Sequence, residues 1–91
     1  MLNEVQQAFA KEVLGITLSR GTRVEIHFRK LDGRERTLIA LPSDQIPEDR
    51  LPQGVQPVHS WPDGLIRIFS EVEQDWRSIK LENIETMKVL L

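Results

Sequence analysis

Hydrophobic and polar residues alternate most regularly in residues 65–81. Ile66 and Ile68 alternate with Arg67 in the first half of this segment, and Ile79 and Leu81 alternate with Ser78 and Lys80 in the second half. The acidic sequence EVEQD separates the two halves. Because successive side chains of a strand point to opposite faces of a sheet, the pattern predicts a β-hairpin whose isoleucines and leucine lie in the core.

Two large residues of this hairpin have a less obvious place in the pattern. Trp76 has the opposite parity to Ile79, so we expect it to face outward or to cover a rim of the fold. Arg77 has the same parity as the core positions. A charge there needs a partner, and we expect Asp75 or a residue of the segment before the hairpin to supply it.

Residues 2–14 follow a helical pattern, because apolar residues recur at every fourth position. The stripe consists of Val5, Phe9 and Val13, widened by Leu2 and by Ala10 or Leu14. Asn3 is a suitable N-cap, and Gly15 is placed to end the helix in a left-handed conformation. The sequence predicts a helix that covers one side of a sheet. It leaves open a helix whose stripe binds a partner instead.

Two further strands are predicted between residues 22 and 41. In residues 22–29, Val24, Ile26 and Phe28 alternate with polar residues, so one face of this strand is expected to be buried. The tight-turn sequence Asp32-Gly33 joins it to a second strand, residues 36–41. The sequence does not decide which face of the second strand is buried. The inner residues are either Thr37, Ile39 and Leu41 or Leu38 and Ala40.

Residues 42–63 contain all five prolines of the chain and show neither the helical nor the strand pattern of apolar residues. We expect a long proline-rich loop there, because proline interrupts both helices and sheets. Residues 85–91 predict a last strand with Met87, Val89 and Leu91 on one face.

These elements predict a single domain that spans residues 1–91. It contains a helix at residues 2–14, strands within 22–41 and 64–91, and the loop at 42–63. One helix followed by five short antiparallel strands is typical of a mainly β fold of the SH3 or Sm type, which is a small five-stranded barrel.

Two segments resemble known families. The sequence IRIFSEVEQDWRSIKLENI resembles the closing strands of WYL-type domains, and FRKLDGRERTLIALPSDQIPED resembles the front half of a phage-encoded group of Sm-like SH3 barrels with WYL-like character. Together they cover roughly residues 22–84. The resemblance implies a small barrel fold and a phage or mobile-element origin. The Trp-Tyr-Leu tripeptide that names WYL domains is absent, so Arg77 is the one residue carried over from their ligand pocket.

The charge of the chain is close to balanced, with 12 basic and 14 acidic residues and a formal net charge of −2. This balance disfavours a protein whose main task is to coat nucleic acid, because that affinity comes largely from Lys and Arg. Residues 20–36 are locally basic. The chain has no cysteine, and we find neither a signal-peptide pattern nor an apolar run of membrane-spanning length. We therefore expect a cytoplasmic protein, in the host cytoplasm if it is phage-encoded.

Catalytic signatures are missing from the sequence. The two histidines, His27 and His59, are far apart and have no metal-ligand spacing, and there is no phosphate-binding loop and no nucleophile elbow. We expect a protein without enzymatic activity, cofactor or metal.

The favoured function is binding to a host protein, because small barrels have open edge strands and because Trp and Arg often dominate interfaces. The candidate partner-binding residues lie in the loop and on the hairpin: Ile46, Arg50, Trp61 and Trp76. The same edge strands would also allow a homo-oligomer.

The alternative function is binding of single-stranded nucleic acid or a nucleotide ligand by the basic 20–36 region. Its candidate residues are Arg20, Arg23, Arg29, Lys30, Arg34, Arg36 and Arg77. Neither function is expected to involve a membrane.

Overall fold

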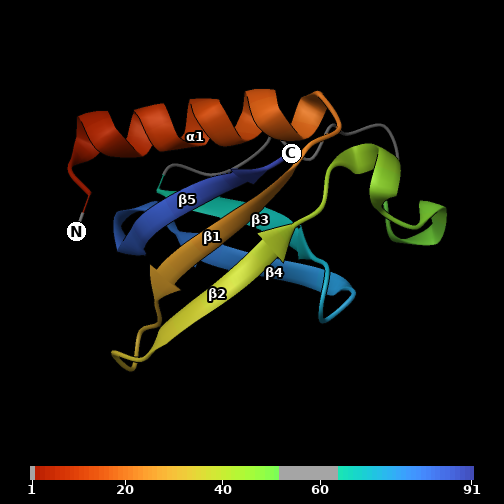
Figure 1. The fold of residues 1–91 in the computed structure, drawn as a ribbon. Coiled ribbons are helices and arrows are strands. Elements are labelled where there is room, and N and C mark those ends of the chain that lie inside the picture. Colours follow the sequence, from red (N-terminus) through yellow and green to blue (C-terminus); the bar gives the residue numbers. More distant parts are fainter. Residues whose placement is uncertain (1, 52–63) are drawn as a thin grey trace.

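The computed structural model describes residues 2–51 and 64–91 and shows one helix lying across a five-stranded antiparallel sheet (Figure 1). The elements are α1 (Glu4–Ser19), β1 (Arg23–Arg29), β2 (Glu35–Ala40), β3 (Leu65–Ser70), β4 (Asp75–Lys80) and β5 (Ile84–Leu90). Their order in the sheet is β4-β3-β2-β1-β5, so β4 and β5 are its two edges. A mainly β fold with an N-terminal helix is confirmed. The sheet is open, however, so the expected closed barrel is not confirmed.

The sheet bends sharply between β2 and β3. β1 pairs with β2 and β5 along most of their length, whereas β2 and β3 share the single register pair Ala40–Ser70. Beside it, the backbone N–H of Leu41 donates to the carbonyl of Phe69 at 3.0 Å. The β3–β4 hairpin therefore passes behind β1 and β2 instead of extending the sheet flat (Figure 1).

The main core fills the space between the two parts of the sheet and α1. Val24, Ile26 and Phe28 are buried as predicted, and Leu38 and Ala40 settle the inner face of β2. The remaining buried residues of this cluster are Ala10, Leu14, Leu18, Ile66, Ile68, Ile79, Leu81 and Ile84. The predicted core positions of the 65–81 hairpin are thus confirmed.

The buried face of α1 differs from the predicted stripe. Ala10, Leu14 and Leu18 are buried, whereas the side chains of Val5 and Phe9 are 79% and 67% exposed. The prediction was wrong for Val5 and Phe9, whereas Ala10 and Leu14, which it added at the side of the stripe, are buried. It ended the helix before Leu18. The buried stripe is recognisable only when the helix continues far enough to include that residue.

The end of α1 also differs from the prediction. Asn3 caps the N-terminus as expected, accepting a hydrogen bond from the backbone N–H of Gln6 at 2.8 Å. Gly15 lies inside the helix, and Gly21, which follows the C-cap residue Arg20, has the left-handed conformation with φ +80°. A helical glycine costs about 1 kcal/mol, less than the ~1.5–3 kcal/mol that burial of Leu18 contributes.

The last strand is an edge strand, and this changes which of its residues are buried. Ile84 is buried and Met87 packs against the core, but Val89 is 42% exposed and Leu91 is fully exposed. The prediction placed Met87, Val89 and Leu91 on one face. Of these three residues, Met87 packs against the core, whereas Val89 and Leu91 are exposed near the end of the strand.

Short connections complete the described chain. Two turns of 3₁₀ helix, η1 (Ser43–Gln45) and η2 (Glu48–Arg50), follow β2, and a third, η3 (Leu81–Asn83), joins β4 to β5. The backbone N–H of Leu2 donates to the carbonyl of Glu82 in η3 at 3.0 Å. This bond fixes the start of α1 beside β5.

Candidate interaction surfaces

Three of the four residues predicted to bind a protein partner pack together on the outer face of β3 and β4. Ile46 is buried in a small cluster with Phe69, and Trp76 packs against it. The ring of Trp76 meets the ring of Phe69 edge to face, with centroids 5.4 Å apart. Trp76 Nε1 donates a hydrogen bond to the carbonyl of Arg50 at 2.9 Å. The fourth residue, Trp61, lies outside the described residues.

This cluster fixes residues 41–51 against the β3–β4 hairpin. The guanidinium of Arg50 pairs with Asp75 and lies 5.9 Å from the centre of the Phe69 ring. Ile46 is only 7% exposed, whereas Trp76 is half-buried and Arg50 is exposed, so Trp76 and Arg50 are the predicted residues of this cluster that a partner could reach. A role for these residues in binding a partner stays a prediction.

Arg77 is paired with Asp75, as predicted, at 3.3 Å. It also pairs with Glu73 at 2.8 Å, and Arg36 of β2 pairs with the same Glu73 carboxylate. The backbone N–H of Trp76, which donates to Asp75 at 2.8 Å, lowers the pKa of that carboxyl, and Arg77 adds to the effect. These ion pairs join β2 to the β3–β4 turn and to β4.

Four of the seven predicted anion-binding residues line one cavity of about 500 Å³, which we call the basic cavity. They are Arg29, Lys30, Arg36 and Arg77. The cavity lies between the β1–β2 hairpin and the ends of β3 and β4. Phe28, Leu38 and Ile79 add apolar wall. The site thus combines apolar surface with a basic rim.

The other predicted basic residues do not reach this cavity. Arg34, at the tip of the β1–β2 hairpin, pairs with Asp32 at 2.7 Å, and this contact lowers the pKa of Asp32. Arg20 is the C-cap residue of α1, and Arg23 pairs with Glu71 at 2.7 Å at the start of β1.

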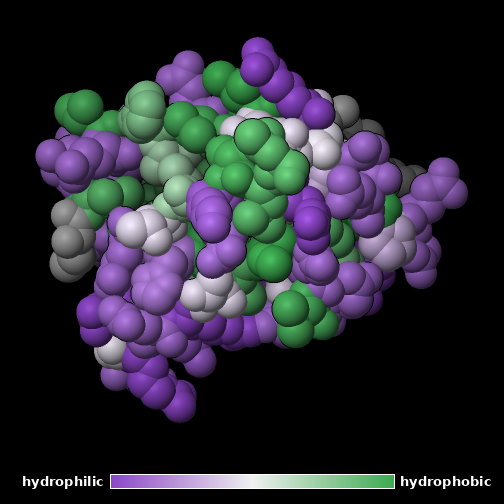
Figure 2. All heavy atoms as spheres, viewed as in Figure 1, coloured by the Kyte–Doolittle hydropathy of each residue, from purple (hydrophilic) through white to green (hydrophobic). Residues whose placement is uncertain are grey.

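Sequence reasoning missed Lys80, which also lines the basic cavity. The alternation in β4 placed this lysine outward, but no local signal showed that the end of β4 returns to the β1–β2 hairpin. Figure 2 shows that hydrophilic residues gather at the tip of this hairpin, while hydrophobic residues gather closer to α1 and in the middle of the same face.

A second surface lies between α1 and the edge strand β5. Val5 and Phe9 of α1 line a cavity of about 370 Å³ together with Ala10, Ile84 and Met87. We call these five residues the α1–β5 surface. It combines exposed large apolar side chains with a strand whose outer backbone edge is unpaired in the described sheet.

One group of possible metal ligands occurs among the described residues. His27, Glu35 and Glu85 present ligand atoms that lie within 4.8 Å of one another. They belong to three neighbouring strands, β1, β2 and β5, and none of them was predicted as a site residue.

Comparisons with known proteins do not assign the chain to a family: no family model, no curated protein and no solved structure matches it. In the part of the chain that the structure describes, no helix is long and apolar enough to cross a membrane. The fold is therefore defined by its own architecture, a helix on an open five-stranded antiparallel sheet.

Proposed function

We propose that this protein is a non-enzymatic interaction module that binds a second protein through the α1–β5 surface. We interpret the bent sheet as an open variant of the SH3- or Sm-type small barrel. The resemblance of residues 22–84 to phage-encoded small barrels supports a host protein as the partner. The observation that carries the proposal is the exposure of Val5 and Phe9 beside the free edge of β5.

The free edge of β5 determines what kind of segment can bind. Unpaired backbone N–H and C=O groups along a strand are satisfied best by another strand. The occupant that fits is therefore an extended segment of the partner, which adds to β5 and places an apolar side chain in the adjoining cavity. Val5 and Phe9 supply the apolar contacts, and burial of large apolar side chains is a main source of interface energy.

Substitution of Val5 by glutamate tests this surface. We expect Val5→Glu to weaken partner binding at least about tenfold, because a charge would then enter the apolar contact. Val72→Glu is the matched control, since Val72 in the β3–β4 turn has the same 79% exposure but lies away from β5. Affinities are measured by calorimetry with the purified partner, identified as a protein retained from nuclease-treated host lysate by the wild type.

Two further measurements separate this proposal from its alternatives. Binding should protect the backbone amides of β5 from hydrogen exchange. Equal binding by Val5→Glu and Val72→Glu would place the interface elsewhere. Light scattering that shows a dimer of the wild type, lost in Val5→Glu, would identify a second copy of the chain as the occupant and contradict the host-protein proposal.

A second candidate function is binding of single-stranded nucleic acid or a nucleotide in the basic cavity. The observation that favours it is the convergence of Arg29, Lys30, Arg36 and Arg77 on one cavity with apolar wall. Apolar wall can contact a base, and the basic rim can neutralise phosphate.

Lys30 offers the clearest test, because the three arginines of the rim already pair with carboxylates in the described residues. We expect Lys30→Glu to weaken binding of a labelled single-stranded oligonucleotide and to reduce the salt slope of log K by about 0.7 per lost phosphate contact. Lys88→Glu, an equal charge change on β5, is the control. Fluorescence anisotropy at several salt concentrations measures both quantities. No binding by the wild type at low salt would exclude this function.

A further inference from the structure

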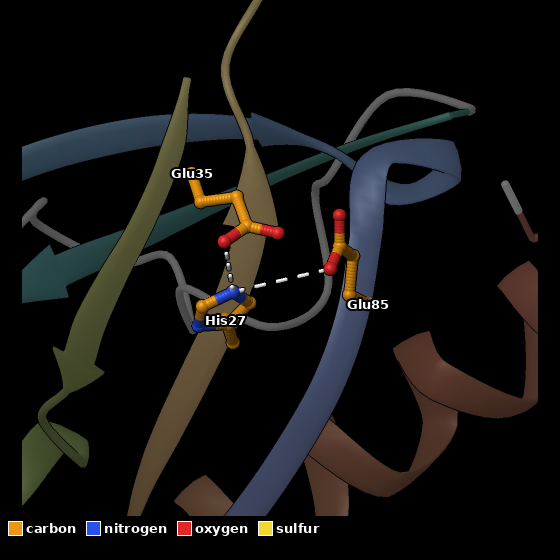
Figure 3. Close-up of side chains that lie close together, drawn as sticks. All are labelled: His27, Glu35 and Glu85. Carbon is orange, nitrogen blue, oxygen red and sulfur yellow. Dashed lines mark ion pairs between the residues drawn. The ribbon is translucent and has the colours of Figure 1, made fainter. Parts of the chain in front are cut away.

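The outer face of the β2–β1–β5 part of the sheet carries one histidine between two carboxylates. His27 lies on β1, Glu35 on β2 and Glu85 on β5, and Figure 3 shows the two carboxylates approaching the same side of the imidazole. The Nε2 atom of His27 is 3.7 Å from Oε2 of Glu35 and 3.9 Å from Oε2 of Glu85. All three side chains are partly exposed, so an ion from solvent can reach them.

A register shift in β5 contributes to this arrangement. His27 is paired with Thr86 and Phe28 with Ile84, so Glu85 is the extra residue of a bulge. A bulge changes the direction in which a strand side chain points and often occurs at functional sites. Glu85, the extra residue in β5, places its carboxylate near His27 of the neighbouring strand.

Arg29 contacts one oxygen of each of the two carboxylates. Its Nη2 atom lies 3.3 Å from Oε1 of Glu35 and 3.1 Å from Oε1 of Glu85. The Oε2 atoms of both residues are the ones that face His27. Arg29 therefore orients both carboxylates and leaves one oxygen of each available as a ligand.

Thr37 orients the histidine from the other side. The Nδ1 atom of His27 lies 3.0 Å from the hydroxyl oxygen of Thr37, which is opposite His27 in the β1–β2 register. When Nδ1 carries the proton and donates to this hydroxyl, Nε2 presents its lone pair to the carboxylates. Metal-binding histidines commonly have such a partner on the second ring nitrogen.

We propose that His27, Glu35 and Glu85 bind one divalent transition-metal ion of the Zn²⁺ class. Tetrahedral Zn²⁺ with ligand bonds of about 2.0–2.2 Å needs ligand atoms about 3.4 Å apart. The two distances from His27 Nε2, 3.7 and 3.9 Å, are a few tenths of an ångström longer than this, and all three ligand atoms lie within 4.8 Å of one another, so the two glutamate side chains must move toward the ion. Two carboxylates and one arginine leave a negative charge that the ion offsets. The fourth position is open to water or to a ligand from a partner.

The donor set also predicts which ions are excluded. One imidazole nitrogen with two carboxylate oxygens suits Zn²⁺ or Co²⁺, whereas Mg²⁺ and Ca²⁺ prefer oxygen ligands alone. A bound ion would connect three adjacent strands, including the edge strand β5. None of the three ligands lines the basic cavity, but Glu85 also lines the cavity between α1 and β5, so the metal site adjoins the proposed protein interface.

Calorimetric titration of the chelator-treated protein with ZnCl₂ tests the proposal. We expect one saturable site per chain in the wild type and none with MgCl₂ under the same conditions. His27→Ala should weaken Zn²⁺ binding by more than about tenfold, and Thr37→Val, which removes only the orienting hydroxyl, by about tenfold. His59→Ala, at the only other histidine of the sequence, should bind as the wild type does.

An NMR titration of the wild type tests the same site without depending on the folding of a variant. In the wild type, Zn²⁺ should shift the imidazole NMR signals of His27 and leave those of His59 unchanged, and Glu85→Gln should reduce the shift at a given ion concentration. Absence of saturable binding, an unchanged isotherm for folded His27→Ala, or loss of binding in His59→Ala would each overturn the proposal.

Discussion

Replacing Phe69 by alanine is expected to lower the free energy of unfolding by about 3–5 kcal/mol, because a buried aromatic ring leaves a cavity that its neighbours fill only in part. Phe69 is 1% exposed, and its ring contacts Trp76 edge to face and lies beneath the guanidinium of Arg50. The substitution therefore removes the centre of the contact between residues 41–51 and the β3–β4 hairpin.

Urea denaturation followed by circular dichroism measures the loss of stability. The control is Val72→Ala on the exposed turn of the same hairpin, where we expect a change within about 0.5 kcal/mol. A double-mutant cycle with Trp76→Leu should give a coupling of roughly 0.5–1.5 kcal/mol for the ring pair. A loss below about 1 kcal/mol for Phe69→Ala would show that residues 41–51 do not pack on this ring in solution.

Replacing Leu14 by alanine is the second large expected effect, with a loss of about 2.7–5 kcal/mol. Leu14 is completely buried and connects α1 to the main core. Alanine keeps the helix propensity high, so the loss would report on packing rather than on helix formation. Thermal unfolding would show a fall in Tm of about 4–8 °C for each kcal/mol in a domain of this size.

Phe9→Ala is the matched control on the same helix. Phe9 belongs to the stripe that the sequence predicts to be buried, yet its side chain is two-thirds exposed in the structure. We expect Phe9→Ala to cost well under 1 kcal/mol. A larger loss for Phe9→Ala than for Leu14→Ala would mean that α1 docks through the face with Val5 and Phe9.

The strands were predictable because their patterns are local. Val24, Ile26 and Phe28 alternate with polar residues over one strand, and the isoleucines of residues 65–81 do so over a hairpin. Periodicity within residues 2–14 could not choose the buried face of α1, because Leu18, which completes the buried stripe with Ala10 and Leu14, lies beyond the predicted end of the helix. The sequence of β2 likewise did not decide which of its faces is buried. In the structure, Leu38 and Ala40 of β2 lie in one core with Ile66 and Ile68 of β3.

The candidate sites were less predictable because they form from distant segments. Composition identified the basic residues, but only the sharp bend between β2 and β3 brings Arg77 and Lys80 to Lys30. The group around His27 was invisible in sequence, since its ligands come from three strands and one depends on a bulge. Trp76 was expected to face outward or to cover a rim of the fold, and it lies outside the main core. Its contacts with residues 41–51 were not foreseen.

The pairing of β1 with β5 implies an order for folding. The β1–β2 and β3–β4 hairpins close over short turns and can form within about 1–10 μs, whereas β1 and β5 lie near opposite ends of the described chain. Closing so long a loop carries an entropic penalty that is recovered only when β5 docks. We infer that β5 joins the sheet last. Until it does, β1 is an unprotected edge strand, with which a strand of another chain could pair before folding is complete.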